Sequence, residues 1–179
     1  MTRMLPMQPS ERMAPRFWAV ALALILLYLW QLGAAPLFDV DEGAFSEATR
    51  ELLSSGDWGH TTLNGTDRFD KPIRVYWLQA ASMAVFGVNE WATRLPSALC
   101  VLASTWAAGR FAARRWGQPT GALAALVLGS GLGLLSIGRA ATADGLLNCL
   151  LVAISLSLWQ FAESGARKPL RWAYFWCGL

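Results

Sequence analysis

Long uninterrupted runs of apolar residues constrain the fold of this chain more than any other feature. A soluble domain of 179 residues breaks its apolar side chains into periodic patterns, whereas here they come in stretches long enough to cross a bilayer. Only 15% of the residues are charged, against about a quarter in soluble domains, and the chain contains ten tryptophans, a residue type that favours membrane interfaces. We therefore predict an all-α, polytopic transmembrane fold.

The apolar runs divide the chain into membrane spans and connecting segments. A polar and basic segment, residues 1–16, precedes a first span over 17–37, which is too long for the apolar core of a signal peptide. A polar loop over 38–91 follows. Three further spans are predicted, and then the start of a fifth that is too short to cross a bilayer, so we expect the N-terminal fragment of a longer protein. These segments are 92–113, 119–139, 144–162 and 170–179.

The placement of lysine and arginine predicts the orientation, because cytoplasmic loops of membrane proteins are enriched in both. If 72–86 does not span, one side holds nine basic residues, whereas the segment 38–94 on the other side holds five basic and nine acidic residues. The 15-residue stretch 72–86 is also short for a span, and we predict that it lies in the membrane interface. Residues 42–55 are predicted to form a second, amphipathic helix of the outer loop, and Asn64-Gly65 a tight turn. The N-terminus is then cytoplasmic and the loop 38–91 periplasmic.

Ionisable residues gather at three places, all on the predicted outer side. Each place has a plain structural explanation: acids at a helix start, cations that extend to the lipid surface, and a charged turn at the membrane boundary. Together they offer carboxylates for base chemistry and cations for a phosphate. The three groups are Asp39, Asp41 and Glu42; then Arg68, Asp70, Lys71 and Arg74; and finally Arg139 and Asp144.

The order of these motifs resembles the superfamily of protein O-mannosyltransferase-like enzymes and aminoarabinose lipid A transferases, a glycosyltransferase family 39-like group. The resemblance runs over nearly the whole chain. It implies a GT-C fold, in which many transmembrane helices surround a site at the outer face and the first outer loop holds interfacial helices. The matching strings are Asp41-Glu42-Gly43-Ala44-Phe45-Ser46-Glu47, Ser55-Gly56-Asp57-Trp58, Leu63-Asn64-Gly65, Phe69-Asp70-Lys71-Pro72, Arg94-Leu95-Pro96-Ser97 and Arg139-Ala140 with Thr142 and Asp144.

The resemblance also implies roles for residues of this chain. Asp41 would be the catalytic carboxylate, and Lys71 would bind the phosphate of a lipid-linked sugar donor. Apart from the resemblance, we add Arg74 and Arg139 as further cations for this phosphate, because both lie on the predicted outer side. The carboxylates that would line the same cavity are Glu42, Asp70 and Asp144. The chain departs from the aminoarabinose-type pattern at Ala44-Phe45 and at Arg68, so the identity of the sugar stays open.

The predicted function is transfer of a sugar from a polyprenyl-phosphate donor to a lipid, for example lipid A, or to a protein acceptor, with inversion at the anomeric carbon. The site would open to the outer face of the bacterial inner membrane. No metal-binding set stands out, although a divalent cation held by carboxylates such as Asp39 or Asp41 stays open. Two alternatives remain: a transporter or channel fragment, in which Arg139 and Asp144 serve an ion path, or an inactive remnant of the glycosyltransferase.

Overall fold

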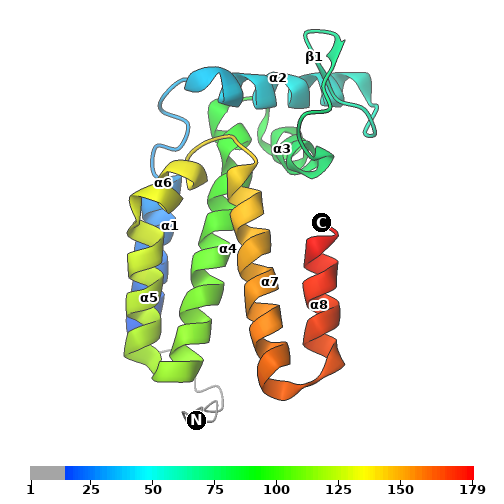
Figure 1. The fold of residues 1–179 in the computed structure, drawn as a ribbon. Helices are drawn as coiled ribbons and strands as arrows, with labels where there is room; N and C mark the ends of the chain where they lie inside the picture. The colour runs from blue at the N-terminus through cyan, green and yellow to red at the C-terminus, as the bar shows by residue number, and fades with distance from the viewer. Residues whose placement is uncertain (1–14) are drawn as a thin grey trace.

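The computed structural model describes residues 15–179 of the chain. The predicted cytoplasmic segment 1–16 therefore lies almost entirely outside the described residues, as do its basic side chains Arg3 and Arg12. The long helices stand side by side in a bundle, in which α4 contacts α5 and α7, α7 contacts α8, and α1 packs on α5 (Figure 1). These helices are α1 (Pro15–Leu29), α4 (Glu90–Trp116), α5 (Gln118–Ser130), α7 (Asp144–Ser164) and α8 (Arg167–Cys177).

A second layer crosses one end of the bundle. α2 (Asp39–Ser55) lies across this end, and α3 (Ile73–Phe86), seen almost along its axis in Figure 1, lies below it. A short antiparallel hairpin of β1 (Thr62–Leu63) and β2 (Thr66–Asp67) connects the two helices. Its turn has positive φ at Asn64 (53°) and at Gly65 (73°), which is the geometry of a two-residue hairpin loop. The tight turn predicted at these two residues is confirmed.

Small residues allow α4 and α5 to approach each other closely. A Cβ atom built on Gly121 would lie 2.4 Å from Ala113 Cβ, and one built on Gly109 would lie 2.8 Å from Ala125 Cβ. Real Cβ atoms essentially never come this close to another atom, so glycine alone fits at these two positions without a shift of the helices. This is the packing that small residues give to helices in membranes.

The segment 119–139, predicted as one span, is not one straight helix. α5 ends at Ser130, the short helix α6 (Leu132–Gly138) follows, and the two axes are bent by 64°. Gly131 between them has an extended backbone (φ −63°, ψ 132°), which interrupts the helical hydrogen bonding. The bend directs the chain across the end of the bundle, where residues 139–143 connect α6 to α7.

The remaining helices follow the predicted segments with shifted ends. α1 stops at Leu29 instead of extending to residue 37, and residues 30–38 form an irregular connection to α2. α8 begins at Arg167, three residues before the predicted start at 170. α4 and α7 contain the predicted spans 92–113 and 144–162, and the predicted helices 42–55 and 72–86 correspond to α2 and α3.

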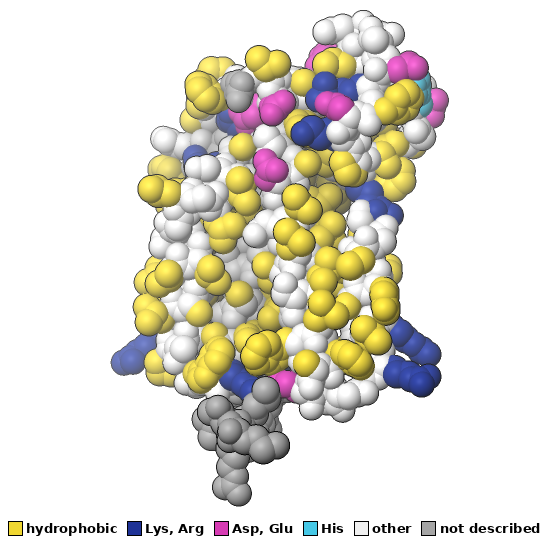
Figure 2. Space-filling model, in the orientation of Figure 1, with side chains coloured by type: hydrophobic (Ala, Val, Ile, Leu, Met, Phe, Trp, Pro, Cys, Tyr) yellow, Lys and Arg dark blue, Asp and Glu magenta, His cyan; other side chains and the backbone are white. Residues whose placement is uncertain are grey.

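The flanks of the bundle are apolar and exposed. Figure 2 shows hydrophobic side chains over the upright helices, with most charged side chains gathered toward the two ends. Among the described helices, α7 alone is by itself long and apolar enough to cross a membrane, and α5 with α6 qualifies if the bent pair counts as one span. Only 6% of the most apolar part of α7 is buried within the fold, so this helix presents its side chains outward, as a helix in contact with lipid does.

Candidate functional site

Glu42 and Arg94 form a buried ion pair where the crossing layer meets the bundle. Each side chain is 6% exposed, and Arg94 Nη2 lies 2.8 Å from Glu42 Oε2. Glu42 Oε1 also accepts hydrogen bonds from Arg94 Nε (2.9 Å) and from the backbone N–H of Ala141 (2.6 Å). Glu42 Oε2 accepts a further bond from the backbone N–H of Phe38 (2.6 Å). Glu42 therefore joins α2 to the start of α4 and to the connection that precedes α7.

The remaining N–H groups of Arg94 hold the connection between α1 and α2. They donate to the carbonyls of Leu32, Ala35 and Pro36 at 2.8–3.0 Å. Burial by itself raises the pKa of Glu42, but the hydrogen bonds from Arg94, Ala141 and Phe38, together with the Arg94 charge, outweigh burial and place the pKa below its ordinary value. Glu42 is thus a buried structural anion, which differs from the cavity-lining position predicted for it.

Asp41, the neighbour of Glu42 on α2, is exposed. It lies one helical turn before Phe45, whose ring packs on Tyr76 of α3 with the centroids 5.4 Å apart. Two cations lie over the same Phe45 ring: Arg68 Cζ at 5.8 Å and Lys71 Nζ at 6.0 Å from its centroid. The predicted catalytic carboxylate and the predicted phosphate-binding lysine are therefore on the same side of the crossing layer, near one aromatic ring.

Arg68 is the central cation of this cluster. Its Nε donates to Tyr76 Oη (3.0 Å), and its Nη2 lies 3.1 Å from Asp70 Oδ2. The hydrogen bond to Tyr76 raises the pKa of Arg68 above its ordinary value, and the charges of Asp70 and Asp41 add smaller contributions. Asp70, predicted to line the cavity, is thus at the cluster and paired with Arg68.

α3 is fixed beneath α2 by a buried polar contact. Gln79 Oε1 accepts from Thr49 Oγ1 of α2 at 2.8 Å, and Gln79 Nε2 donates to the carbonyls of Thr93 and Ala141, each at 3.4 Å. These bonds connect α3 to α2, to the start of α4 and to the connection before α7. The structure thus gives Gln79 a positioning role for α3, the helix that carries Tyr76, which its place in the apolar stretch 72–86 did not indicate.

Asp144 begins α7 close to the same cluster. It is exposed, and one of its oxygens accepts from Thr142 Oγ1 at 3.1 Å. Its neighbours Ala143 and Leu146 pack against the core formed by Phe45, Ala48, Val75 and Tyr76. The first turn of α7 therefore lies close to the Phe45 ring, over which Arg68 and Lys71 are placed.

Arg139, predicted to assist Lys71 with the phosphate, is engaged elsewhere. The hydrogen bond described for Arg74 goes to an oxygen of Leu179, the last residue of the given sequence, so the role of Arg74 stays a prediction. Arg139 donates to carbonyls of residues 27, 28, 30 and 31 at the C-terminal end of α1. A cation at this end of a helix satisfies free carbonyls and interacts well with the helix dipole. None of the contacts described for Arg139 joins it to Lys71 or Phe45.

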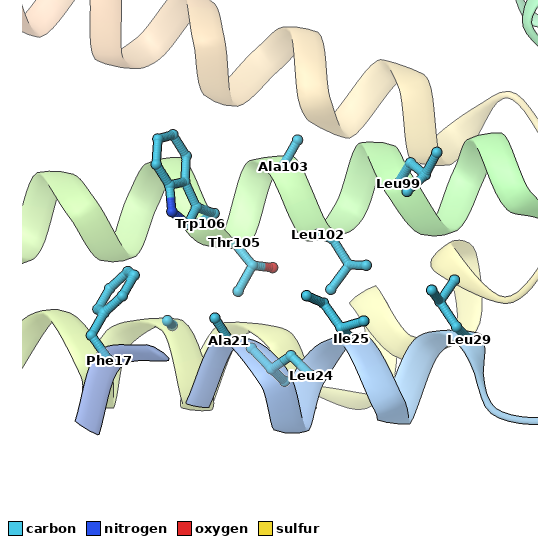
Figure 3. A pocket seen from close by; sticks show the side chains of 11 residues that line it. Phe17, Ala21, Leu24, Ile25, Leu29, Leu99, Leu102, Ala103, Thr105 and Trp106 are labelled. Atoms are coloured by element: carbon cyan, nitrogen blue, oxygen red, sulfur yellow. The ribbon is translucent and has the colours of Figure 1, made fainter. Parts of the chain in front are cut away.

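An apolar cavity of about 340 Å³ lies within the bundle (Figure 3). Side chains of α1 and α4 line it, among them Phe17, Leu24, Leu102 and Trp106. None of the eleven described residues that line the cavity is a predicted site residue. The charged cluster over Phe45 is therefore the candidate site, and the cavity is a separate feature.

The described residues contain no group of three or more His, Cys, Asp or Glu side chains arranged to hold a metal ion. The side chain of Asp39, one of the two carboxylates considered for a divalent cation, lies outside what the structure describes. Metal binding at Asp39 or Asp41 therefore stays a prediction.

The sequence analysis assigned no role to Arg94, and it placed Arg68 in the second charged group without a role of its own. The sequence could have indicated a buried ion pair at Arg94, because a charged residue at the start of the apolar segment 92–113 is energetically costly unless it is paired. The sequence indicated a specific role for Arg68 less clearly, since cations close to a membrane surface are common.

The exposed apolar flanks, the close helix packing and the charged cluster at one end define a helical membrane protein with a polar site at the end of its bundle. The family model described as Dolichyl-phosphate-mannose-protein mannosyltransferase matches residues 70–179. The chain belongs to this family of membrane glycosyltransferases, as the resemblance seen in the sequence predicted. Membrane localisation is supported by the same match.

Relatives found by sequence similarity agree with this assignment. The chain is 35% identical over 150 residues to the undecaprenyl phosphate-alpha-4-amino-4-deoxy-L-arabinose arabinosyl transferase of Shewanella sediminis, covering 81% of this chain and 27% of that protein. It is 32% identical over 163 residues to the enzyme of the same name from Aeromonas salmonicida, covering 90% of this chain and 30% of that protein. The chain thus spans less than a third of the length of these relatives.

Two solved structures share the fold. The apo structure of ArnT from Cupriavidus metallidurans superposes with a TM-score of 0.76 at 26% identity, covering 89% of this chain and 29% of that one. The structure of the same protein bound to undecaprenyl phosphate gives a TM-score of 0.72, also at 26% identity, and covers 80% of this chain and 28% of that one. The predicted all-α membrane fold of the GT-C type is confirmed.

Proposed function

We propose that the full-length protein is an integral-membrane glycosyltransferase that takes its sugar from a polyprenyl-phosphate donor. The observation that carries this proposal is the position of the exposed Asp41 one turn from Phe45, whose ring lies against Arg68 and Lys71. The cluster offers a carboxylate that can accept a proton and cations that can bind a phosphate. The names of the relatives, and the undecaprenyl phosphate bound by the ArnT structure, indicate the class of donor.

In the proposed reaction Asp41 is the general base. Its carboxylate takes the proton of an acceptor hydroxyl while the acceptor oxygen forms a bond to the anomeric carbon of the sugar. The bond between that carbon and the phosphate oxygen breaks, the configuration inverts, and the electron pair leaves with the polyprenyl phosphate. Lys71 stabilises the negative charge that develops on this leaving group, an electrostatic effect that is often the largest catalytic contribution.

The acceptor in this proposal is a lipid or a protein with a free hydroxyl at the outer face of the inner membrane. Lipid A is the acceptor that the aminoarabinose-type resemblance favours. The sugar stays open, because the residues around the cluster, Ala44-Phe45 and Arg68, differ from the aminoarabinose-type pattern.

The proposed orientation has the candidate site on the periplasmic side and the N-terminus in the cytoplasm. α4 starts at Glu90 beside the crossing layer and ends at the opposite end of the bundle, where α8 also begins (Figure 1). The basic clusters near these two points therefore lie at the end away from Asp41, as expected for a cytoplasmic side. The clusters are Arg110, Arg114 and Arg115, and Arg167, Lys168 and Arg171.

The substitution Asp41→Asn in the full-length protein tests the proposed base. We expect transfer of sugar from a polyprenyl-phosphate donor to fall by about 10²–10⁴-fold, the usual contribution of a positioned general base, at an unchanged protein level in the membrane. The control is Asp57→Asn, because Asp57 is also exposed in the crossing layer and its bond to the Gly59 N–H can be kept by asparagine. Transfer by Asp41→Asn at the level of the control would remove Asp41 from the mechanism.

A further inference from the structure

The side chain of Arg68 is held in one position by three different groups. Its guanidinium is hydrogen-bonded to Tyr76, paired with Asp70 and placed over the Phe45 ring. The Arg68 side chain is only 14% exposed, and Tyr76 is fully buried. Because Tyr76 and Phe45 belong to the packed core between α2 and α3, the guanidinium is attached to a rigid part of the fold.

The backbone of Arg68 is fixed as well. Its N–H donates to the carbonyl of Thr61 at 2.9 Å, and its carbonyl accepts from Thr61 Oγ1 at 2.5 Å. Thr61 is itself only 4% exposed. The hairpin is bonded to α2 through Glu51, which accepts from Thr62 Oγ1. The connection that precedes the hairpin is bonded to α3 through Trp77 Nε1, which donates to the carbonyl of Trp58 at 2.8 Å. Arg68 is therefore positioned before any ligand arrives.

Lys71 approaches the same ring but is held differently. It is exposed and makes no ion pair or hydrogen bond with the described residues. Two cations thus lie within 6.0 Å of one ring centroid, the first rigid and planar, the second on a flexible stem. Both cations can contribute to the attraction of an anion that binds beside this ring.

We propose that Arg68 is a second binding residue for the donor phosphate, acting together with Lys71, and that the Arg68–Asp70 pair sets how tightly the phosphate is held. This inference rests on the proposed function and extends it to a residue to which the resemblance gives no role. Arg68 Nη1 has no hydrogen-bond partner among the described residues, and a guanidinium binds phosphate oxygens through two N–H groups at once. Asp70 competes with the phosphate for Arg68 Nη2 because the pair is open to solvent on the carboxylate side, where Asp70 is 51% exposed.

The test measures binding of undecaprenyl phosphate to the purified full-length protein in detergent. We expect Arg68→Gln to raise the Kd about 10- to 100-fold, the range for a lost hydrogen bond to a charged group. The matched control is Arg50→Gln, because Arg50 lies on α2 in an exposed pair with Glu47 and should leave the Kd unchanged. Asp70→Asn should lower the Kd, since it frees Arg68 and removes a negative charge.

The outcomes separate this inference from the proposed function. Unchanged binding by Arg68→Gln, with binding lost in Lys71→Gln, would overturn the role of Arg68 and leave the proposed function intact. No binding of undecaprenyl phosphate by the wild-type protein would overturn both. If Arg68→Gln does not fold, Arg68→Lys decides. Lysine keeps the positive charge but lacks the planar fork of N–H groups, so a higher Kd supports the inference and an unchanged Kd contradicts it.

Discussion

The substitution Glu42→Gln probes the ion pair that joins the crossing layer to the bundle. Each oxygen of Glu42 accepts two hydrogen bonds, the first from Arg94 and the second from a backbone N–H. Glutamine keeps the size of the side chain but turns an oxygen into an NH₂ group, which donates and does not accept. Whichever way the amide is turned, its NH₂ group faces two N–H groups, and the variant loses one bond from Arg94 and one from the backbone.

The size of the effect follows from these two lost bonds and from the buried charge that remains. A hydrogen bond that involves a charged group contributes about 1.5–3 kcal/mol, and a neutral one about 0.5–1.5 kcal/mol. Breaking a buried ion pair by changing one partner costs about 3–5 kcal/mol, because the other charge stays buried. We expect the free energy of unfolding of the full-length protein to fall by about 3–5 kcal/mol.

The assay is unfolding in mixed micelles of dodecyl maltoside and SDS, followed by far-UV circular dichroism. The control is Glu47→Gln, which removes a carboxylate from the same helix. Glu47 pairs with Arg50 at 2.6 Å, but the two side chains are 35% and 50% exposed, so this change should cost less than about 1 kcal/mol. A loss for Glu42→Gln no larger than that of the control would refute the structural role of the pair.

The same pair predicts how stability depends on pH. The pKa of Glu42 is lower in the folded protein than its ordinary value of 4.5, so the unfolded chain binds the proton more readily. The stabilisation is fully present above the unfolded pKa and is lost as the pH falls through the lowered folded pKa. Glu42→Gln should remove this part of the acid dependence.

Two further predictions concern packing and orientation. Gly121→Ala should reduce the free energy of unfolding by about 1–3 kcal/mol, because its Cβ would lie 2.4 Å from Ala113 Cβ, whereas Gly133→Ala, with no atom within 4 Å, should have little effect in the same assay. In a variant without the native cysteines, His60→Cys in the crossing layer should react with a membrane-impermeant maleimide added to whole spheroplasts, and Gly165→Cys between α7 and α8 should react only after lysis. The opposite labelling pattern would reverse the proposed orientation.

The local features of the fold could be predicted because they depend on neighbouring residues. The apolar runs predicted where the long helices lie, the short stretch 72–86 predicted the separate helix α3, and Asn64-Gly65 predicted the turn. The break at Gly131 could not be predicted, because the run around it is rich in small apolar residues and a glycine inside a membrane helix is common.

The contacts of the site were harder to predict because they join distant parts of the chain. Glu42 and Arg94 are 52 residues apart, and nothing in either local pattern indicates the other. Arg139 was grouped with Lys71 because both lie on the predicted outer side, but sharing a side of the membrane does not bring two residues into contact. In the structure Arg139 donates hydrogen bonds to the backbone carbonyls at the C-terminal end of α1.

Two adjacent carboxylates on α2 point in different directions, since successive residues of a helix are rotated by about 100°. Glu42 is buried at the junction and Asp41 is exposed beside the cations. A genetic screen for loss of transfer would therefore recover both positions as equally essential. Immunoblotting would separate them, because cells carrying an Asp41 variant would accumulate the protein at normal abundance, whereas cells carrying a Glu42 variant would lose it to quality-control proteases.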